Sequence, residues 1–432
     1  MLHLSESSKY LMRLRIDHLL ASLRDRPHEI LAAIDGDPLL LKREVNGLVL
    51  ANATKALFTP LVEHQLFAKG IIYRRDPYRL VSLPLIKIYN LGERNVTVHD
   101  LVSLQVPGSR AHFLRKFDGT MIQRFQHDGR VYFSTRGMLE GVVLPTNEAQ
   151  DEDAPPQARM FDYLAAARET ARAMYPQLVE PWAELEGVTL ILELLHPEAR
   201  VITDYKGRRD LVLLAAFDTV RHVYWPYERI RRFANEHRLV ATDAFRPDGP
   251  TLAKQVDSLL ASLAGTDEEG TVVVVEHGDE VVYRVKVKSQ DYLRMLKLMV
   301  RCTYPATVEM LDGWPSFPDW PAMEEKLQAL GSEKVPEELL AQYREHYDAF
   351  AAYRSDCETL RARIQVRSDE LRKNLSGHDP RAVRKEYAQR ALREPFPPLF
   401  FSAFDRKLDI DRVREIFATH PEVREALRVT NT

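Results

Sequence analysis

Hydrophobic and polar residues alternate along much of the first two thirds of the chain, a pattern that predicts strands. An amphipathic helix is expected first, over residues 5–24, and strands are expected from about Phe67 to about Asp291. Two hairpins are predicted, one turning at His127-Asp128-Gly129 and one at His277-Gly278-Asp279. Short Gly-containing turns between alternating runs favour such hairpins.

Two further strands and one helix are expected within this region. The strands should cover VTLILELL (188–195) and RDLVLLAAF (209–217), and the helix should cover 160–174. An acidic, proline-containing stretch at 146–158 precedes that helix and is expected to be an exposed loop.

The periodicity changes after about Leu296. WPSFPDWP (314–321) reads as a loop, and helical spacing follows over 336–364, 379–392 and 409–420. The predicted fold class is therefore α+β, with one domain built on antiparallel sheets and an all-α domain after it. The expected domains are 1–300, including an N-terminal helical extension, and 301–432.

Composition adds few constraints. The 432 residues are 45% hydrophobic and 28% charged, with a formal net charge of -3, so any basic surface must be local. The two cysteines, Cys302 and Cys357, form no CxxC pair, which favours a reducing compartment. Charges interrupt the apolar residues at the N-terminus and no long apolar run follows, so neither a signal peptide nor a membrane span is expected. The expected location is the cytoplasm.

Several common catalytic motifs are missing from the sequence. It contains no GxxxxGK[ST], GxGxxG, HExxH or GxSxG. P-loop ATPases, Rossmann enzymes, zincins and serine hydrolases are therefore disfavoured.

A lysine stands at a predicted strand end in KFDGT (116–120). A lysine amine becomes a nucleophile when burial, nearby cations or a metal ion lower its pKa. The glycine at Gly119 would let a ligand approach the backbone closely. Taken alone, Lys116-Phe117-Asp118-Gly119 is also compatible with an ordinary solvated hairpin turn.

Three cations alternate along one predicted strand, at Arg284, Lys286 and Lys288. Alternate residues share a strand face, so these charges repel one another unless anions lie before them. A triphosphate is one candidate, and an edge strand with a charged outer face is the alternative. The preceding strand begins with Glu268 and Glu269, which places carboxylates at its entrance.

Glu193 lies among apolar residues in VTLILELL. A buried carboxylate needs a cation or hydrogen-bond donors. Ribose hydroxyls or hydrated magnesium would supply them.

Six stretches occur in an order that resembles one protein superfamily. They are KFDGT (116–120), STRG (134–137), LELLHPEAR (192–200), LVLLAAFD (211–218), EEGTVVV (268–274) and VKVKSQDYLRM (285–295). The order resembles the covalent nucleotidyltransferases, which include nucleic-acid ligases and RNA-capping enzymes. Within them the chain is most similar to the phage-type, RNA ligase 1-like enzymes that repair tRNA. The upstream run from Ala68 to Glu93 also resembles that family, so the likeness covers about residues 60–300.

The resemblance implies an ATP-dependent RNA ligase that carries AMP covalently on Lys116 and uses Mg2+ or Mn2+. The implied catalytic residues are Lys116, Lys286 and Lys288. The implied nucleotide-binding residues are Lys69, Asp118, Gly119, Arg136, Glu193, Phe217, Glu269, Lys286 and Lys288. Asp118, Glu193 and Glu269 would meet the metal through water. Phe217 would stack on adenine, and the alternative for it is a plain core residue.

Two positions depart from the family pattern. Lys69 stands where the family usually has an arginine that contacts phosphate, and lysine lacks the bidentate fork of a guanidinium group. Arg136 stands where the family often has lysine, which is a milder change.

The implied partner is RNA with 5′-phosphate and 3′-hydroxyl ends, which includes nicked tRNA, and a separate kinase or phosphatase would prepare such ends. The alternatives are a catalytically silent RNA-binding protein with this fold and a DNA ligase or capping-type enzyme. The last two normally carry a β-barrel after the fifth motif, where this chain reads as helical. Basic residues are dense between Arg361 and Arg393, which is compatible with a solvated helical face or with an RNA-specificity surface.

Overall fold

The computed structural model describes residues 15–53, 62–93, 96–103, 107–140, 142–143, 161–266, 268–332, 335–373, 375 and 379–420. The chain divides into two compact units. The first is Met1–Val300 with Leu330–Glu333, and the second is Arg301–Ala329 with Lys334–Thr432. Within the described ranges, no helix combines the length and apolar character that a membrane span requires.

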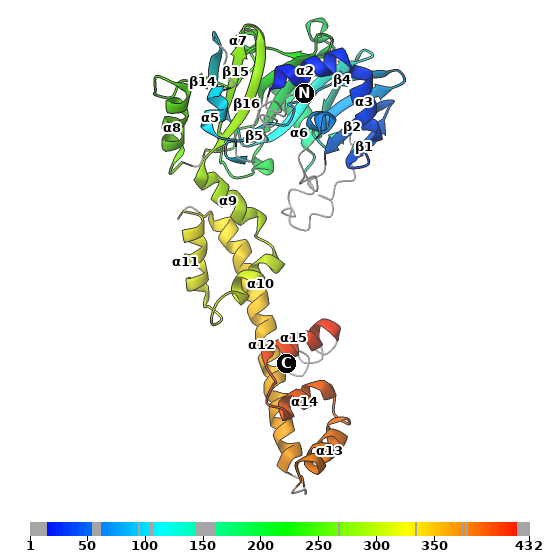
Figure 1. Ribbon diagram of the computed structural model, residues 1–432, viewed down its shortest axis with the longest axis vertical. Helices are drawn as coiled ribbons and strands as arrows, with labels where there is room; N and C mark the ends of the chain where they lie inside the picture. The colour runs from blue at the N-terminus through cyan, green and yellow to red at the C-terminus, as the bar shows by residue number, and fades with distance from the viewer. Residues whose placement is uncertain are drawn as a thin grey trace, which may run out of the picture. The chain divides into compact units, whose positions relative to one another are not determined.

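The first unit contains three sheets (Figure 1). The first sheet, in the order β1-β2-β3-β4, contains β1 (Leu40–Val45), β2 (Leu48–Ala53), β3 (Lys69–Arg75) and β4 (Tyr78–Ser82). The second, in the order β10-β9-β8-β7-β11-β12-β13, contains β7 (Thr120–His127), β8 (Arg130–Ser134), β9 (Met138–Leu139), β10 (Val142–Val143), β11 (Val188–Leu195), β12 (Asp210–Asp218) and β13 (Val223–Tyr224). The third, in the order β14-β6-β15-β16-β5, contains β5 (Tyr89–Asn90), β6 (Arg110–Lys116), β14 (Ala244–Phe245), β15 (Gly270–His277) and β16 (Glu280–Lys288).

Neighbouring strands in these sheets are antiparallel, except that β5 runs parallel to β16. Helices cover the sheets: α2 packs on β16, α3 on β1 and β4, α6 on β7, β8 and β12, and α7 on β12. The helices of this unit are α2 (Ile16–Asp25), α3 (Pro27–Gly36), α4 (Glu63–Phe67), α5 (Val98–Ser103), α6 (Tyr163–Met174), α7 (Tyr227–His237), α8 (Leu252–Leu263) and α9 (Gln290–Val300). Three 3-10 turns are η3 (Pro176–Leu178), η4 (Ala183–Leu185) and η5 (Pro197–Ala199).

Both predicted hairpins are confirmed. His127 pairs with Arg130, and the two turn residues Asp128 and Gly129 have φ angles of 48° and 71°. Positive φ at both positions is the geometry of a two-residue turn that matches strand twist. His277 pairs with Glu280 across the second turn.

The predicted start of the strands near Phe67 is wrong, because β1 and β2 come earlier. Asn46 and Gly47 form their turn with φ angles of 51° and 74°, and Asn-Gly is itself a strong hairpin signal in the sequence. The expected helix over 5–24 is described only from Ile16, and the expected loop at 146–158 lies outside the described residues.

Helices α7 and α8 interrupt the region that was expected to be mainly strands. In α8 the buried residues are Leu252, Val256, Leu259 and Leu263, which follow helical rather than alternating spacing. Thr251 caps this helix by accepting a hydrogen bond from the Lys254 backbone. The helical signal was therefore present in the sequence.

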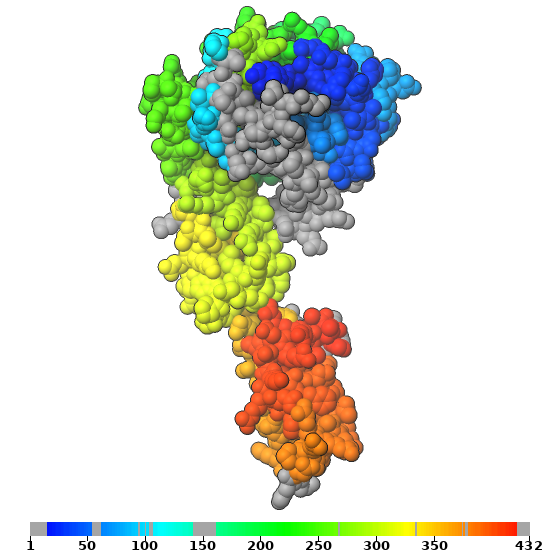
Figure 2. All heavy atoms as spheres, in the orientation of Figure 1, coloured from blue at the N-terminus to red at the C-terminus, as the bar shows by residue number. Residues whose placement is uncertain are grey.

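The second unit is helical, as predicted. It is built from α10 (Tyr304–Asp312), α11 (Trp320–Leu330), α12 (Glu337–Lys373), α13 (Pro380–Ala391), α14 (Pro397–Phe404) and α15 (Ile410–Thr419). Helices α13, α14 and α15 pack along α12, and their atoms, orange to red, form one continuous body in Figure 2. Their shared core includes Tyr387, Phe400 and Phe417. The α+β fold class, with antiparallel sheets followed by helices, is confirmed.

Gly270 allows β15 and β16 to approach closely. Its φ is +140°, and a Cβ atom added there would lie 2.1 Å from the Val287 carbonyl oxygen. We expect Gly270→Ala to lower the free energy of unfolding by at least about 2–3 kcal/mol, because both the conformation and the contact become strained.

Gly278→Ala is the matched control. Its φ is +58° and a Cβ there meets nothing within 4 Å, so only the left-handed backbone is penalised, by about 1–2 kcal/mol. Chemical denaturation of both variants measures the difference. Equal losses would contradict the contact with Val287.

Candidate active site

Strands β6, β15 and β16 place the predicted lysines in aligned rows. Lys116 lies opposite Gly270, and Gly270 lies opposite Lys288. The next row on the same face contains Leu114, Val272 and Lys286, and the row after it contains His112, Val274 and Arg284. The expectation that Arg284, Lys286 and Lys288 share one strand face is consistent with this register.

Glu269 joins two of the lysines. Its Oε2 atom accepts a hydrogen bond from Lys116 Nζ, and its Oε1 atom lies 2.8 Å from Lys288 Nζ. The Glu269 carboxylate is buried, with 5% of its side chain exposed. One carboxylate, directly before the first residue of β15, therefore holds the ends of β6 and β16 together.

Positive charge exceeds negative charge around this contact. Burial, followed by repulsion from Lys116 and Lys288, lowers the pKa of Lys286 to about 8. Burial disfavours the charged form of Lys286, and the nearby Glu269 carboxylate opposes this effect only in part. An incoming phosphate would supply further negative charge.

Glu193 lies beside the lysines, on β11. Burial is the main cause that raises the pKa of Glu193 to about 7, and Lys116 partly opposes it. Its Oε1 atom accepts a hydrogen bond of 3.1 Å from the Gly119 backbone. A Cβ atom at Gly119 would lie 2.4 Å from the Leu194 carbonyl oxygen, so only glycine fits between β7 and β11 here.

Asp118 anchors the turn that carries Lys116. Its Oδ2 atom accepts hydrogen bonds of 2.8 Å from the backbones of Ile202 and Thr203, and its Oδ1 atom accepts one of 2.7 Å from the Tyr292 hydroxyl. The Asp118 backbone N–H donates to the Tyr205 hydroxyl at 2.7 Å. These contacts give Asp118 a role in positioning the turn, while its predicted contact with metal-bound water stays a prediction.

A cavity of about 220 Å³ opens in front of the aligned rows. Its charged lining residues include Lys116, Glu193, Lys286 and Arg284, and its apolar lining is formed by Leu85, Ile88, Leu114, Phe117, Met121, Leu214, Val272 and Val274. A flat apolar ring would fit such walls, with its charged substituents toward the lysines.

Phe217 does not line this cavity. It is completely buried in the main core, and its ring meets that of Tyr224 edge-on at a centroid distance of 4.9 Å. Its position favours the alternative, a core residue. Leu214, on the same strand, is half-buried and lines the cavity instead.

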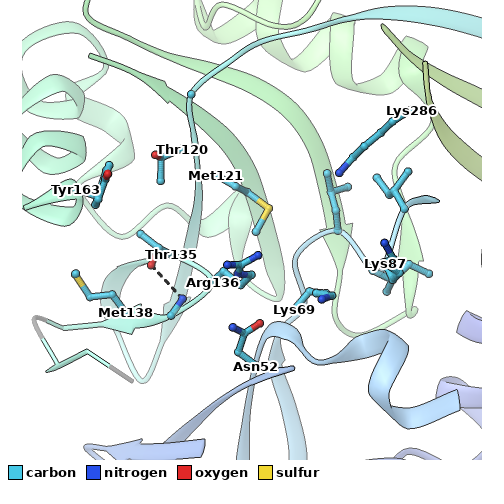
Figure 3. A pocket seen from close by; sticks show the side chains of 15 residues that line it. Asn52, Lys69, Lys87, Thr120, Met121, Thr135, Arg136, Met138, Tyr163 and Lys286 are labelled. Atoms are coloured by element: carbon cyan, nitrogen blue, oxygen red, sulfur yellow. Dashed lines mark hydrogen bonds between the residues drawn. The ribbon is translucent and has the colours of Figure 1, made fainter. Parts of the chain in front are cut away.

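A second cavity, of about 590 Å³, shares Gly119 and Lys286 with the first. Lys69, Lys87 and Arg136 reach it from separate elements (Figure 3). Burial and the charges of Arg136 and Lys87 lower the pKa of Lys69 to about 8. This cavity is therefore a second place where anions would be stabilised.

No role was predicted from the sequence for Lys87 or for Arg284 by itself. Lys87 lies in the run IKIYN, part of the upstream segment that resembles the family, and its Nζ atom is 2.7 Å from Glu93. Arg284 was recognised only as a member of the charged strand. No cluster of three or more His, Cys, Asp or Glu side chains within the described ranges could hold a metal ion directly.

The predicted site residues thus fall into four groups. Lys116, Lys286, Glu193 and Gly119 line the smaller cavity, and Glu269 and Lys288 are joined to this group through the contacts of Glu269 with Lys116 and Lys288. Lys69 and Arg136 line the larger cavity. Asp118 is held in the turn below Lys116, and Phe217 lies in the core.

Comparison with known proteins finds similarity to RNA ligases. No protein-family model matches the chain. A protein of Thermovibrio ammonificans described as "Putative RNA ligase" is 27% identical over 192 residues, which are 44% of this chain and 43% of that protein. The match thus spans less than half the length of this relative.

Solved structures with similarity to the chain include an archaeal ATP-dependent RNA ligase, form 1, with 16% identity and a TM-score of 0.41 over 87% of this chain and 89% of that one. A mutant RNA ligase of Naegleria gruberi with ATP and Mn has 17% identity and a TM-score of 0.33 over 46% of this chain and 55% of that one.

The lowered lysine pKa values predict how ATP binding depends on pH. Lys69 and Lys286 each have a pKa of about 8 in the free protein, so both lose their charge as pH rises through that value. Since a polyanion binds better to the charged forms, we expect the dissociation constant for ATP to increase above about pH 8.

Calorimetry in EDTA at neutral and alkaline pH measures this dependence without phosphoryl transfer. The variant Lys69→Gln/Lys286→Gln should bind more weakly at neutral pH and show a flatter profile. An affinity of the unaltered protein that stays constant to about two pH units above neutrality would contradict the prediction.

Proposed function

We propose that this protein is an ATP-dependent RNA ligase that joins RNA 5′-phosphate and 3′-hydroxyl ends through an AMP adduct on Lys116. The observation that carries the proposal is the shared Glu269 carboxylate between Lys116 and Lys288, with Lys286 and Glu193 beside it at one cavity. The order of the six sequence motifs and the similarity to the Thermovibrio ammonificans protein support it.

In the first step the neutral amine of Lys116 attacks the α-phosphorus of ATP. The Nζ–P bond forms as the bond from that phosphorus to the pyrophosphate oxygen breaks. Glu269, already hydrogen-bonded to Lys116 Nζ, is placed to accept a proton. The ammonium groups of Lys286 and Lys288 stabilise negative charge that develops on the α-phosphate.

The two later steps use the same cavity. An RNA 5′-phosphate oxygen attacks the α-phosphorus as the Nζ–P bond breaks, so that AMP passes to the RNA and the departing Lys116 nitrogen takes up a proton. A 3′-hydroxyl then attacks the activated 5′-phosphate, which forms the phosphodiester and releases AMP. Lys69 and Arg136, in the adjoining larger cavity, are placed to hold either the outer phosphates of ATP or the incoming RNA phosphate.

A divalent cation, Mg2+ or Mn2+, would neutralise phosphate charge and polarise the P–O bond that breaks. Because no described cluster supplies three direct ligands, its contacts with the protein would pass through water. Glu193 and Glu269 are the carboxylates that face the lysines. Glu193 would also accept a hydrogen bond from a ribose hydroxyl.

Two alternative functions, a DNA ligase or capping enzyme and a catalytically silent RNA-binding protein, are less consistent with this chain. A DNA ligase or a capping enzyme is expected to have a β-barrel after the fifth motif, whereas the described residues after Val300 form helices. A catalytically silent RNA-binding protein would not need the nucleophile, yet Lys116, Lys286 and Lys288 are all present.

The helical unit is proposed to contribute RNA specificity. Several of its basic residues are already paired within the unit: Arg384 with Asp405, Arg367 with Glu370 and Glu394, and Arg390 with Glu386. Arg381 and Lys385 are exposed and stand four residues apart, on one face of α13. The basic stretch is thus partly a salt-bridged helical surface and partly accessible to phosphate.

The RNA would carry 5′-phosphate and 3′-hydroxyl ends, and nicked tRNA is the substrate that the family resemblance favours. Where a break leaves other ends, a separate kinase or phosphatase would have to prepare them. The cytoplasm is the proposed location.

Covalent labelling tests the central step. The protein, freed of any pre-bound AMP by treatment with pyrophosphate and checked by intact mass, is incubated with Mg2+ and ATP labelled at the α-phosphate. We expect label to remain on the denatured protein, and to be lost in Lys116→Ala because the attacking amine is absent.

Lys407→Ala is the matched control, since Lys407 is exposed and lies in the helical unit, outside the six motifs. It should label like the unaltered protein. Absence of label on a protein shown to be AMP-free would remove the ligase mechanism, and labelling by GTP in preference to ATP would favour a capping-type enzyme.

RNA affinity tests the exposed face of α13. Arg381→Glu/Lys385→Glu should weaken binding of single-stranded RNA and make the slope of log K against log salt less steep by about 1.4, the value for two lost phosphate contacts. Arg384→Glu is less suitable as a test, because it would also break the ion pair between Arg384 and Asp405.

Arg412→Glu serves as control, because Arg412 is exposed on α15 and paired with Glu415. Fluorescence anisotropy over a salt series provides the measurement. If the slope of log K against log salt is unchanged in the α13 variant, this face of α13 does not bind RNA phosphate and is only a solvated surface.

A further inference from the structure

Arg284 is a buried charge that the proposed mechanism does not use. Only 6% of the residue is exposed, and it lines the smaller cavity. Its Cζ atom lies 4.2 Å from the centroid of the Tyr224 ring. Its Nη1 atom is buried and meets no hydrogen-bond acceptor in the described part of the chain.

Neighbouring polar groups do not satisfy Nη1. The Tyr224 hydroxyl donates to the Pro84 carbonyl at 2.5 Å and accepts from the Ile86 backbone at 3.1 Å. The nearby carboxylate of Glu276 is occupied by the Tyr227 backbone at 2.7 Å and by His112 at 3.2 Å. An unmet donor on a buried charged group is costly, so an acceptor from a ligand would be strongly favoured.

The sheet register places Arg284 at the end of the row of cations that is farthest from Lys116 and Lys288, with Lys286 between. It is four residues from Lys288 on β16, a separation of roughly 13 Å along a strand. Leu114, Val272 and Val274 line the cavity between them. A nucleotide with its α-phosphate at Lys116 would therefore direct its base, the uncharged end, toward Arg284.

We propose that Arg284 donates a hydrogen bond to a ring nitrogen on the edge of the purine base and so contributes to nucleotide selectivity. This inference rests on the proposed function, because it takes a purine nucleotide as the ligand. Arg284 lies over the Tyr224 ring and lines the cavity, and its buried Nη1 atom has no acceptor in the described part of the chain. Adenine offers N1, N3 and N7 as acceptors, whereas N1 of guanine carries a hydrogen, so a hydrogen bond from Arg284 to N1 would favour adenine over guanine.

Base analogues identify the contact. Equilibrium binding of ATP and of its 1-deaza, 3-deaza and 7-deaza forms, each lacking one ring nitrogen, is measured by calorimetry in EDTA on AMP-free protein. For the unaltered protein we expect one analogue to bind about 10- to 100-fold more weakly than ATP, the effect of one hydrogen bond to a charged group.

Arg284→Met tests whether the weaker binding of that analogue results from a lost hydrogen bond with Arg284. The variant should bind ATP about as weakly as the unaltered protein binds the sensitive analogue, and should no longer distinguish the two. Arg284→Lys keeps the charge without the planar fork and should recover part of the discrimination. Arg110→Met, at an exposed arginine on β6, is the control and should match the unaltered protein.

The outcomes distinguish base recognition by Arg284 from a purely structural role of Arg284 and from failure of the proposed ligase chemistry. Equal affinity of the unaltered protein for ATP and all three analogues overturns the proposal, and so does an analogue penalty that persists in Arg284→Met. A purely structural role would lower the melting temperature of Arg284→Met without removing any analogue-specific difference. If the analogue pattern appears while Lys116 takes no label, nucleotide recognition by Arg284 stands and the ligase chemistry fails.

Discussion

The carboxylate of Glu269 is the constraint on which the candidate site depends. It is buried and holds Lys116 from β6 and Lys288 from β16, two strands that lie on opposite sides of β15. Two ammonium groups this close would otherwise repel each other, and one carboxylate permits both to remain at one end of the sheet. The close approach at Gly270 brings the ends of β15 and β16 into this arrangement.

Lys116 also stands where the chain leaves one sheet for another. Strand β6 ends at Lys116 in the third sheet and β7 begins at Thr120 in the second, so the turn between them crosses from sheet to sheet. Asp118 fixes that turn through two backbone N–H groups and the Tyr292 hydroxyl, and Gly119 allows it to lie against β11. The amine is thereby held by parts of the chain more than a hundred residues apart in sequence.

The site is organised for an anion before one binds. Lys69 and Lys286 have pKa values lowered to about 8, and Glu193 has one raised to about 7, all chiefly through burial. Binding of phosphate would offset the repulsion among the cations, and the apolar wall beyond them offers no charge to compete for it. Arg284 is the exception on that wall, which is why its unmet N–H points to the uncharged end of a nucleotide.

The sequence by itself determined the local structure and the identity of the charged groups. Alternation and turn chemistry predicted the β7–β8 and β15–β16 hairpins, and alternation placed Arg284, Lys286 and Lys288 on one face. These features depend on neighbours within a few residues, which the sequence displays directly. The Asn46-Gly47 turn and the apolar spacing of α8 were equally local, and a stricter reading of the same signals would have found them.

Only the tertiary structure decided which distant groups meet. The contact of Glu269 with both lysines, the satisfaction of Asp118 by the 202–203 backbone and the burial of Phe217 against Tyr224 all depend on how separate strands pair. Strand pairing is set by the combined burial of many side chains, not by any one segment. The sequence could therefore name the residues of the site, while the fold decided that Leu214 and Arg284, and not Phe217, would face the cavity.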